Sequence, residues 1–303
     1  MIVSRNEFIY FLGYSLYVLS VSLFNNINIT IAHTLKILSF VILVFSFILS
    51  KYRKKELQVY SLLLVFLLVI SYRLYDTRLL YTYLFIISFP RTEFKRIVKL
   101  DLAIRISGFV ITNALYFIGL GQDIILYRDG SIRHSFGYNH PNTCFAMLII
   151  SGIDLLVLFF DNKRVTKKQA CLIMFYFCVM SVYAEKTGSR TGLLVFLLIF
   201  VFIVLEFAFK IVSKNKYIAS ILQNSSLIVC GISVFIAAFY NSYPILSYLN
   251  TAFTNRLSSM AYFWNNYKPS LFGQILTKVS TQQAELLNTR ALVLDNLYIN
   301  LVL

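Results

Sequence analysis

Residues 127–142 read YRDGSIRHSFGYNHPN, and the run that follows them, 143–160, is apolar almost throughout. The polar part contains two arginines and two of the three histidines of the chain. It ends at Pro141, which suits the first position of a helix because the N–H that proline lacks would have no partner there. The pattern predicts a membrane-spanning helix that starts at Pro141, with His140 at or next to its N-cap.

The same stretch is suited to an anionic ligand. A helix N-terminus attracts anions through its unpaired N–H groups and its dipole. Arg128 and Arg133 add positive charge in the loop just before the helix, and Asn142 lies in the first helical turn. We therefore expect this stretch to hold a phosphate-bearing ligand, with Arg128, Arg133 and His140 as catalytic candidates and His134 and Asn142 as substrate-binding candidates.

The composition indicates a polytopic membrane protein. Of 303 residues, 58% are hydrophobic and only 14% are charged, and the mean hydropathy is +0.73. These values predict an all-α bundle of membrane helices. The net charge of +15 comes from basic residues scattered between apolar runs. Because they form no continuous stripe, we exclude nucleic acid as a partner.

The apolar runs predict about nine or ten transmembrane helices in a single integral membrane domain, 1–303. The shortest internal run, 79–89, is expected to be a half-helix, and the run that starts at 291 is too short by residue 303 to span, so we expect the last span to be incomplete. The larger extracytoplasmic loops are expected at about 121–141, 185–191 and 241–290. The candidate spans are 8–24, 34–50, 57–72, 79–89, 100–120, 142–160, 170–184, 191–209, 218–240 and 291 onward.

The lysine-rich loops predict the orientation. If the N-terminus is cytoplasmic, every short cluster of basic residues falls on the cytoplasmic side, as the positive-inside rule requires. The opposite loops carry isolated arginines among Gly, Ser, Thr and Asn. Arginine offers a planar fork for phosphate, so we expect the chemistry on the outer face. The basic clusters lie at 51–55, 91–99, 163–168 and 210–216.

A second polar loop precedes another apolar helix. Residues 185–192 read EKTGSRTG, in which Ser189 or Thr191 is suited to cap the helix and Gly188 frees the backbone before it. Arg190 would then lie on a second helix N-terminus that faces outward. We expect an anion site here, with Arg190 catalytic and Ser189 substrate-binding; a tight loop with an ordinary cap explains the same residues equally well.

Four more polar positions on the expected outer side are weaker candidates for substrate binding. Arg256 precedes an aromatic cluster, 262–267, which is suited to a sugar-binding surface, to a membrane-interface belt or to the core of the loop. Asp295 lies near the start of the last span. Arg73 and Arg78 flank Asp76, and they are suited either to pair with that aspartate or to contact lipid phosphates.

Charged residues within the spans favour structural roles. Asp101 and Arg105 are one helical turn apart and are expected to pair, and Asp154 lies in a different span without an acidic run around it. No Walker A, GxGxxG, HExxH or DxD motif occurs in the sequence. We therefore expect neither a metal nor another cofactor.

Taken together, these motifs resemble the Wzy-type capsular polysaccharide polymerases of the O-antigen polymerase/ligase superfamily. The likeness covers most of 70–303 in order and spacing, and the HPN stretch, 140–142, with its upstream arginines is its best motif. The other elements that carry it are the TGSRTG loop, 187–192, the late loop with Arg256, Trp264 and Leu271-Phe272-Gly273, and Asp295-Asn296 with Tyr298.

The resemblance implies a metal-independent glycosyltransferase in the bacterial cytoplasmic membrane. It would join oligosaccharide repeat units carried on undecaprenyl diphosphate into surface polysaccharide at the outer leaflet, with membrane lipids, a flippase and a chain-length regulator as partners. Arginines and helix N-termini would stabilise the departing diphosphate. A histidine would accept the proton of the attacking hydroxyl, with His140 as first candidate and His134 as the alternative.

Two other functions remain open. A ligase of the same superfamily would transfer the glycan to a different acceptor, and sequence separates it poorly from a polymerase. A flippase for lipid-linked repeat units would need cationic groups that line a cavity within the spans. Only Arg105 is clearly within a span, which argues against transport.

Overall fold

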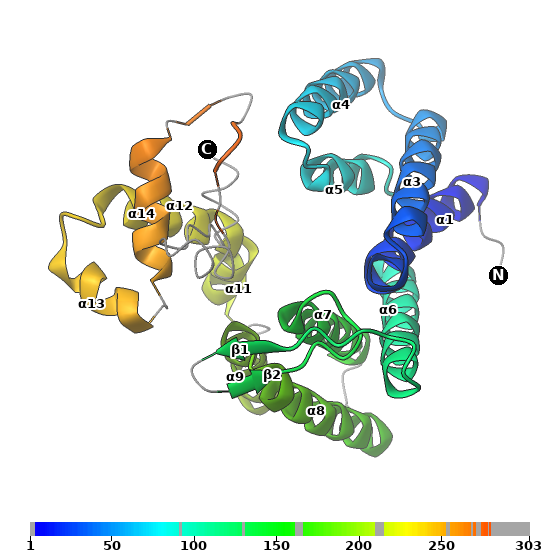
Figure 1. Cartoon of the computed structure of the whole chain (residues 1–303). Helices are drawn as coiled ribbons and strands as arrows, with labels where there is room; N and C mark the ends of the chain where they lie inside the picture. Colours follow the sequence, from blue (N-terminus) through cyan, green and yellow to red (C-terminus); the bar gives the residue numbers. More distant parts are fainter. Residues whose placement is uncertain are drawn as a thin grey trace. The chain divides into compact units, whose positions relative to one another are not determined.

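The computed structural model describes residues 4–90, 93–128, 131–160, 166–209, 215–252, 255–267, 269–270, 274–277 and 279 (Figure 1). They are helical almost throughout. The helices before the hairpin are α1 (Arg5–Leu19), the π-helical turn η1 (Ser20–Phe24), α2 (Asn25–Ile27), α3 (Ile29–Leu49), α4 (Lys54–Leu74), α5 (Arg78–Ile87) and α6 (Phe94–Phe117). The antiparallel hairpin is β1 (Leu126–Arg128) and β2 (Ser131–Arg133). After it come α7 (Pro141–Phe160), α8 (Lys167–Thr187), α9 (Arg190–Phe209), α11 (Lys216–Gln223), α12 (Ser225–Phe239), α13 (Pro244–Ala252) and α14 (Arg256–Asn266).

The helix lengths confirm in outline the expected helical, multi-pass membrane protein. Six helices of the described part are long and apolar enough to cross a membrane, and the pair α11–α12, bent by 60°, adds a seventh if it forms one broken span. The short run expected as a half-helix is α5, which has 10 residues. The six are Arg5–Ile27, Ile29–Leu49, Lys54–Leu74, Phe94–Phe117, Pro141–Phe159 and Lys167–Thr187.

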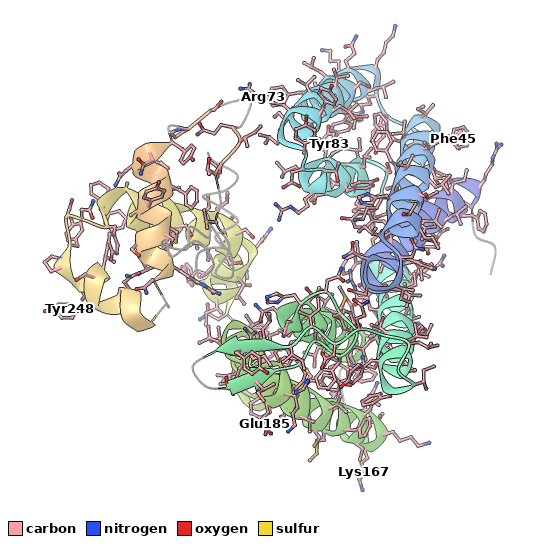
Figure 2. The ribbon with its side chains drawn as sticks, viewed as in Figure 1. Phe45, Arg73, Tyr83, Lys167, Glu185 and Tyr248 are labelled. Atoms are coloured by element: carbon pink, nitrogen blue, oxygen red, sulfur yellow. The ribbon has the colours of Figure 1, made fainter. Side chains whose placement is uncertain are left out.

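The outer surfaces of these helices are rich in exposed apolar side chains. Phe45 projects outward from α3 (Figure 2), and Leu62 on α4 and Phe175 on α8 are 71% and 66% exposed. A protein in water rarely leaves so much apolar surface uncovered. Lipid chains would cover it, which fits the span assignment.

The chain forms two compact units. The first comprises Met1–Leu62 and Tyr81–Val204, and the second comprises Leu63–Leu80 and Leu205–Leu303. In the first unit small residues allow close helix packing, as is common in membrane bundles. A side chain on Gly13 of α1 would meet Leu43 of α3 at 3.0 Å, and the Ser39 hydroxyl donates to the Gly13 carbonyl at 2.7 Å.

Polar contacts join segments at both ends of α1 in the first unit. At one end the Asn139 amide donates to the Asn25 carbonyl at 2.6 Å, which joins the loop before α7 to the turn after α1. At the other end Arg96 and Glu7 form an ion pair at 2.8 Å. These two contacts hold α1 to the loop before α7 and to the start of α6.

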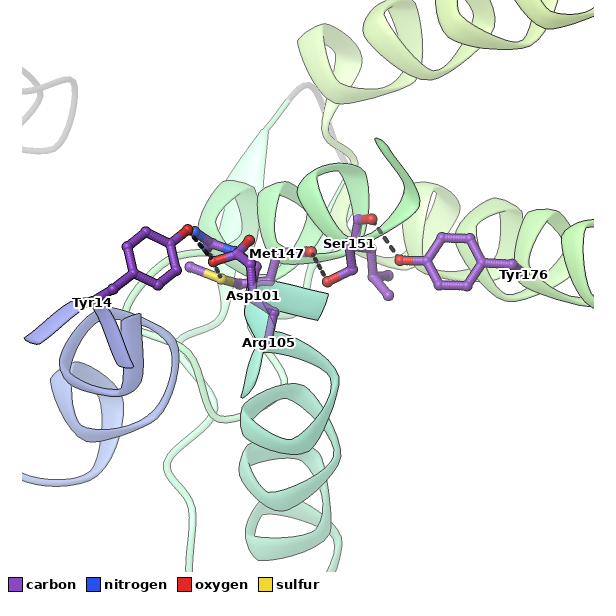
Figure 3. A network of polar contacts seen from close by, with 7 residues as sticks. Tyr14, Asp101, Arg105, Met147, Ser151 and Tyr176 are labelled. Carbon is purple, nitrogen blue, oxygen red and sulfur yellow. Dashed lines mark hydrogen bonds and ion pairs between the residues drawn. The ribbon is translucent and has the colours of Figure 1, made fainter. Parts of the chain in front are cut away.

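A buried polar network joins three helices of the first unit (Figure 3). On α6 the Arg105 Nε donates to Asp101 at 2.5 Å, as expected from their spacing, and the Tyr14 hydroxyl of α1 donates to the same carboxylate at 2.7 Å. Asp154 of α7 interacts electrostatically with both Asp101 and Arg105. Asp154, which is far from Asp101 and Arg105 in sequence, thus joins them in one cluster of ionisable side chains within the spans.

The second unit contains helices where the sequence predicts a long outer loop. Its α14 packs against α12 around Ala237, Leu257 and Phe263, and Trp264 and Tyr267 border this core. Phe263 is fully buried. Within the aromatic cluster 262–267, Phe263 is therefore core of this unit and Tyr262 is exposed. The described part of 241–290 ends at residue 279.

Candidate functional site

His140 caps α7, as the sequence predicts. Its carbonyl accepts from the N–H groups of Thr143 at 3.0 Å and Cys144 at 3.3 Å, and its Nδ1 accepts from the Asn142 N–H at 3.0 Å. A backbone N–H only donates, so this contact requires the proton of a neutral imidazole to lie on Nε2. His140 therefore presents a hydrogen-bond donor at Nε2 and no lone pair there.

Ser189 caps α9. Its hydroxyl accepts from the Gly192 N–H at 3.3 Å, and its carbonyl accepts from the Leu193 N–H at 2.8 Å. Gly188 ends α8 in the left-handed region at φ 55°, a conformation that glycine adopts without steric cost. Of the two expected capping residues, the structure uses Ser189, and Gly188 frees the backbone as predicted.

The two helix N-termini lie side by side. Gly192 in the first turn of α9 packs so closely on Phe145 of α7 that a Cβ atom at this glycine would be 2.1 Å from the ring. Phe145 is fully buried in the cluster that joins α7, α8 and α9. The positive ends of two helix dipoles therefore meet at one end of the first unit, where each adds to the attraction of an anion.

Arg133 ties these elements together. Its side chain is buried; Nε donates to the Thr187 carbonyl and Nη2 to the Asn142 Oδ1, both at 2.7 Å. It thus joins the C-terminal end of α8, where a cation is favoured, to the first turn of α7. Its stem lies against Gly188, where a Cβ would be 3.0 Å away. These contacts favour a positioning role for Arg133 over the ligand contact that we expected.

We expect Arg133→Lys to lower the free energy of unfolding by about 1.5–3 kcal/mol, because one ammonium cannot keep both hydrogen bonds of the fork. Equilibrium unfolding in mixed micelles measures this loss. Ile132→Ala on the same strand is the control, since Ile132 is 53% exposed and its truncation is expected to change stability by about 0.5 kcal/mol or less. Equal stability of Arg133→Lys and wild type would contradict a stabilising role for the two hydrogen bonds of Arg133, which we call the Arg133 tether.

The hairpin brings Asp123 to His134. Its register pairs Leu126 with Arg133, and the same register, continued, places Asp123 beside the residues that follow β2. One carboxylate oxygen of Asp123 accepts from the N–H groups of Ser135 at 2.7 Å and Phe136 at 3.1 Å. The other oxygen lies 2.6 Å from Nδ1 of His134.

Asp123 stays ionised in this setting. Burial raises the pKa of its carboxyl, but the hydrogen bonds from His134, Ser135 and Phe136 outweigh burial and hold the pKa below its ordinary value. Sequence reasoning did not identify Asp123 as a functional residue. Asp123 lies in no motif, and its only signal in the sequence is that of a lone acid in a loop that also carries a histidine.

The other candidate site residues predicted from the sequence fall into three groups. The backbone of Arg128 ends β1 and that of Arg190 begins α9, but their side chains lie outside the described part of the structure, as does all of Asp295. Arg73, Arg78 and Arg256 belong to the second unit. Arg78 forms an ion pair with Asp76, which is one of the two roles expected for it, and Arg73 is exposed.

The site described so far consists of the N-terminal turns of α7 and α9, the Arg133 tether, and the two histidines. Among the described residues no group of His, Cys, Asp and Glu is arranged to hold a metal ion. The chain matches no family model, no curated protein and no solved structure.

Proposed function

We propose that this chain is a Wzy-type membrane glycosyltransferase, which polymerises oligosaccharide repeat units carried on undecaprenyl diphosphate. The reaction would take place at the end of the first unit where α7 and α9 begin. In this reaction the growing glycan leaves one lipid diphosphate and is joined to the terminal sugar of another lipid-linked unit.

The observation that carries the proposal is the pair of adjoining helix N-termini beside two histidines. The leaving group of the reaction is a diphosphate, and its negative charge grows as the glycosidic bond breaks. Donors that are already oriented toward the developing charge stabilise it most. The N-termini of α7 and α9 and the Nε2–H of His140 are donors of this kind. The sequence adds Arg190 at the start of α9 and Arg128 in the hairpin before α7.

The intramembrane network supports an enzyme over a flippase. A transporter of lipid diphosphate would need a cation that lines a path through the spans. Arg105, the intramembrane arginine noted in the sequence, is bound to Asp101 at 2.5 Å, and its side chain is only 15% exposed. A buried arginine that is already paired with a carboxylate is poorly suited to carry a second anion.

Deletion of the gene tests the proposal. We expect the polymer ladder on electrophoresis of surface and lipid-linked glycan to disappear, and mass spectrometry to show single repeat units accumulating on undecaprenyl diphosphate in the outer leaflet. Complementation with the full-length gene is expected to restore the ladder.

Three other outcomes would contradict the proposal. Unchanged glycan would remove the chain from polysaccharide synthesis. A normal ladder on the lipid carrier, with loss of transfer to the final acceptor, would indicate the ligase. Repeat units that accumulate in the inner leaflet, protected from an external glycosidase, would indicate the flippase.

A further inference from the structure

We infer that His134, held by Asp123, accepts the proton of the attacking hydroxyl, and that His140 serves only as a hydrogen-bond donor. The inference rests on the proposed function for the identity of the substrate. Its structural basis is the opposite tautomers of the two histidines, which their hydrogen-bond partners determine.

Asp123 determines the tautomer of His134. An ionised carboxylate accepts hydrogen bonds and has no proton to donate, and the contacts of Asp123 keep it ionised. Nδ1 of His134, 2.6 Å from the carboxylate, must therefore carry the proton. The neutral ring then has its lone pair on Nε2, which is the form that a general base requires.

The ring of His134 is accessible but rigidly placed. One third of its side chain, 33%, is exposed, whereas the Asp123 side chain is only 13% exposed. The His134 N–H donates to the Lys186 carbonyl at the end of α8 at 3.0 Å. Phe136, two residues later, packs its ring on Tyr183 of α8 and Tyr116 of α6, with ring centroids 5.0 and 5.6 Å apart.

The turn after His134 has little room to move. Phe136 and Gly137 both adopt positive φ, at 51° and 83°. A Cβ at Gly137 would be 2.9 Å from the Thr112 carbonyl of α6. Two helices thus fix the loop that carries the base, and catalytic geometry depends on such rigid support.

Among the charged side chains that the structure describes near His134, Asp123 is its partner. Arg133 is committed to Thr187 and Asn142. Lys186 and Glu185 on α8 form a weak, exposed pair with each other at 3.9 Å. Asp123 alone of these carboxylates contacts the imidazole.

In the proposed step one bond forms at the anomeric carbon and one breaks. The hydroxyl oxygen of the acceptor sugar bonds to the anomeric carbon of the donor glycan while its proton passes to Nε2 of His134. The bond from the anomeric carbon to phosphate breaks, and its electron pair leaves with the lipid diphosphate. Asp123 stabilises the imidazolium that forms, which then releases its proton to water.

Nitrogen-15 solid-state NMR of histidine-labelled protein in lipid bilayers tests the tautomers. The chain has only three histidines, and the variants His33→Gln and His140→Asn assign the signals. We expect His134 to carry its proton on Nδ1 and His140 on Nε2 in the wild type. A wild-type His134 with its proton on Nε2 would overturn the inference.

Asp123→Asn separates a catalytic role from a structural one. The amide oxygen can keep the contacts with Ser135 and Phe136, but its NH₂ group now donates toward Nδ1 and moves the imidazole proton to Nε2. We expect the tautomer signal of His134 to switch and the rate of chain growth to fall about 10²–10⁴-fold, the usual contribution of a general base. The membrane level of the protein is expected to stay near that of the wild type.

His134→Gln and His140→Asn provide the comparison. His134→Gln is expected to lose chain growth to the same degree as Asp123→Asn. His140→Asn keeps a good N-cap and is expected to leave the His134 signal unchanged and to retain more chain growth than His134→Gln. Chain growth at the wild-type rate in His134→Gln would overturn the inference. Gene deletion tests the proposed function without reference to either histidine. A negative result there is therefore distinguishable from a negative result for the pair His134–Asp123.

Discussion

Replacement of both Asp101 and Asp154 by asparagine is expected to lower the free energy of unfolding by about 3–5 kcal/mol, because it leaves the buried guanidinium of Arg105 without a carboxylate. Arginine cannot lose its proton to escape this cost. Each single replacement is expected to cost less, since the other carboxylate still interacts with Arg105. The two aspartates are therefore expected to be strongly coupled.

A double-mutant cycle measured by unfolding in mixed micelles gives this coupling. We expect the double variant to lose at least about 0.5 kcal/mol more than the sum of the two singles. Addition of Arg105→Met to the double variant is expected to recover most of the loss, since it removes the unpaired charge. Strictly additive effects would show that Asp154 does not help Asp101 to stabilise the guanidinium of Arg105.

Gly192→Val is expected to cost about 3 kcal/mol, at the upper end of the usual range for overpacking. A Cβ at this position would overlap the Phe145 ring at 2.1 Å and crowd the Ser189 hydroxyl at 2.8 Å, so the contact between the helices and the cap of α9 are disturbed together. Thermal unfolding of the purified protein measures the loss.

Gly231→Val is the matched control for Gly192→Val. Gly231 also lies in a helix, α12, but a Cβ there has no neighbour within 4 Å. We expect Gly231→Val to be neutral or slightly stabilising, because valine has a higher helix propensity than glycine. Addition of Phe145→Ala to Gly192→Val is expected to make room for the larger side chain and to reduce the cost of the substitution. Equal losses of stability in the two glycine variants would contradict the close packing of α9 on α7.

The features that sequence predicts well here are those controlled by neighbouring residues. Pro141 and His140 identify the start of α7, and Gly188 and Ser189 identify the break between α8 and α9, because capping depends on a few adjacent side chains and backbone angles. The apolar runs likewise predict spans, since each depends on local composition, and six of the ten expected runs are helices long and apolar enough to cross a membrane in the described part. The pair Asp101–Arg105 follows from helical spacing in the same way.

The features that sequence does not predict depend on tertiary structure. Asp123 reaches His134 only through the register of a hairpin whose strands have three residues each, too short for a clear alternating pattern. The burial of Arg133 depends on how α7 and α8 approach each other. Asp154 joins the Asp101 cluster only because α6 and α7 pack together, so in sequence it looked like an isolated acid.

The π-helical turn η1 determines where the first span tolerates the loss of one residue. In this turn the Asn25 N–H reaches back to the Ser20 carbonyl, so the turn holds one residue more than an α-helical turn. Five residues of a π turn rotate the chain about as far as four residues of α-helix. Deletion of one residue within 20–24 would therefore restore a regular α-helix and leave the direction of the later residues nearly unchanged. Asn25 and Asn26 would then still face Asn139, to which they now bind. Deletion of one residue in the regular helix α1 would instead rotate them away by about 100°. Loss of one residue in the π turn therefore keeps the phase of the helix, whereas loss of one residue in α1 changes it. The latter detaches the loop of the proposed active site while the span itself remains long enough to cross the bilayer.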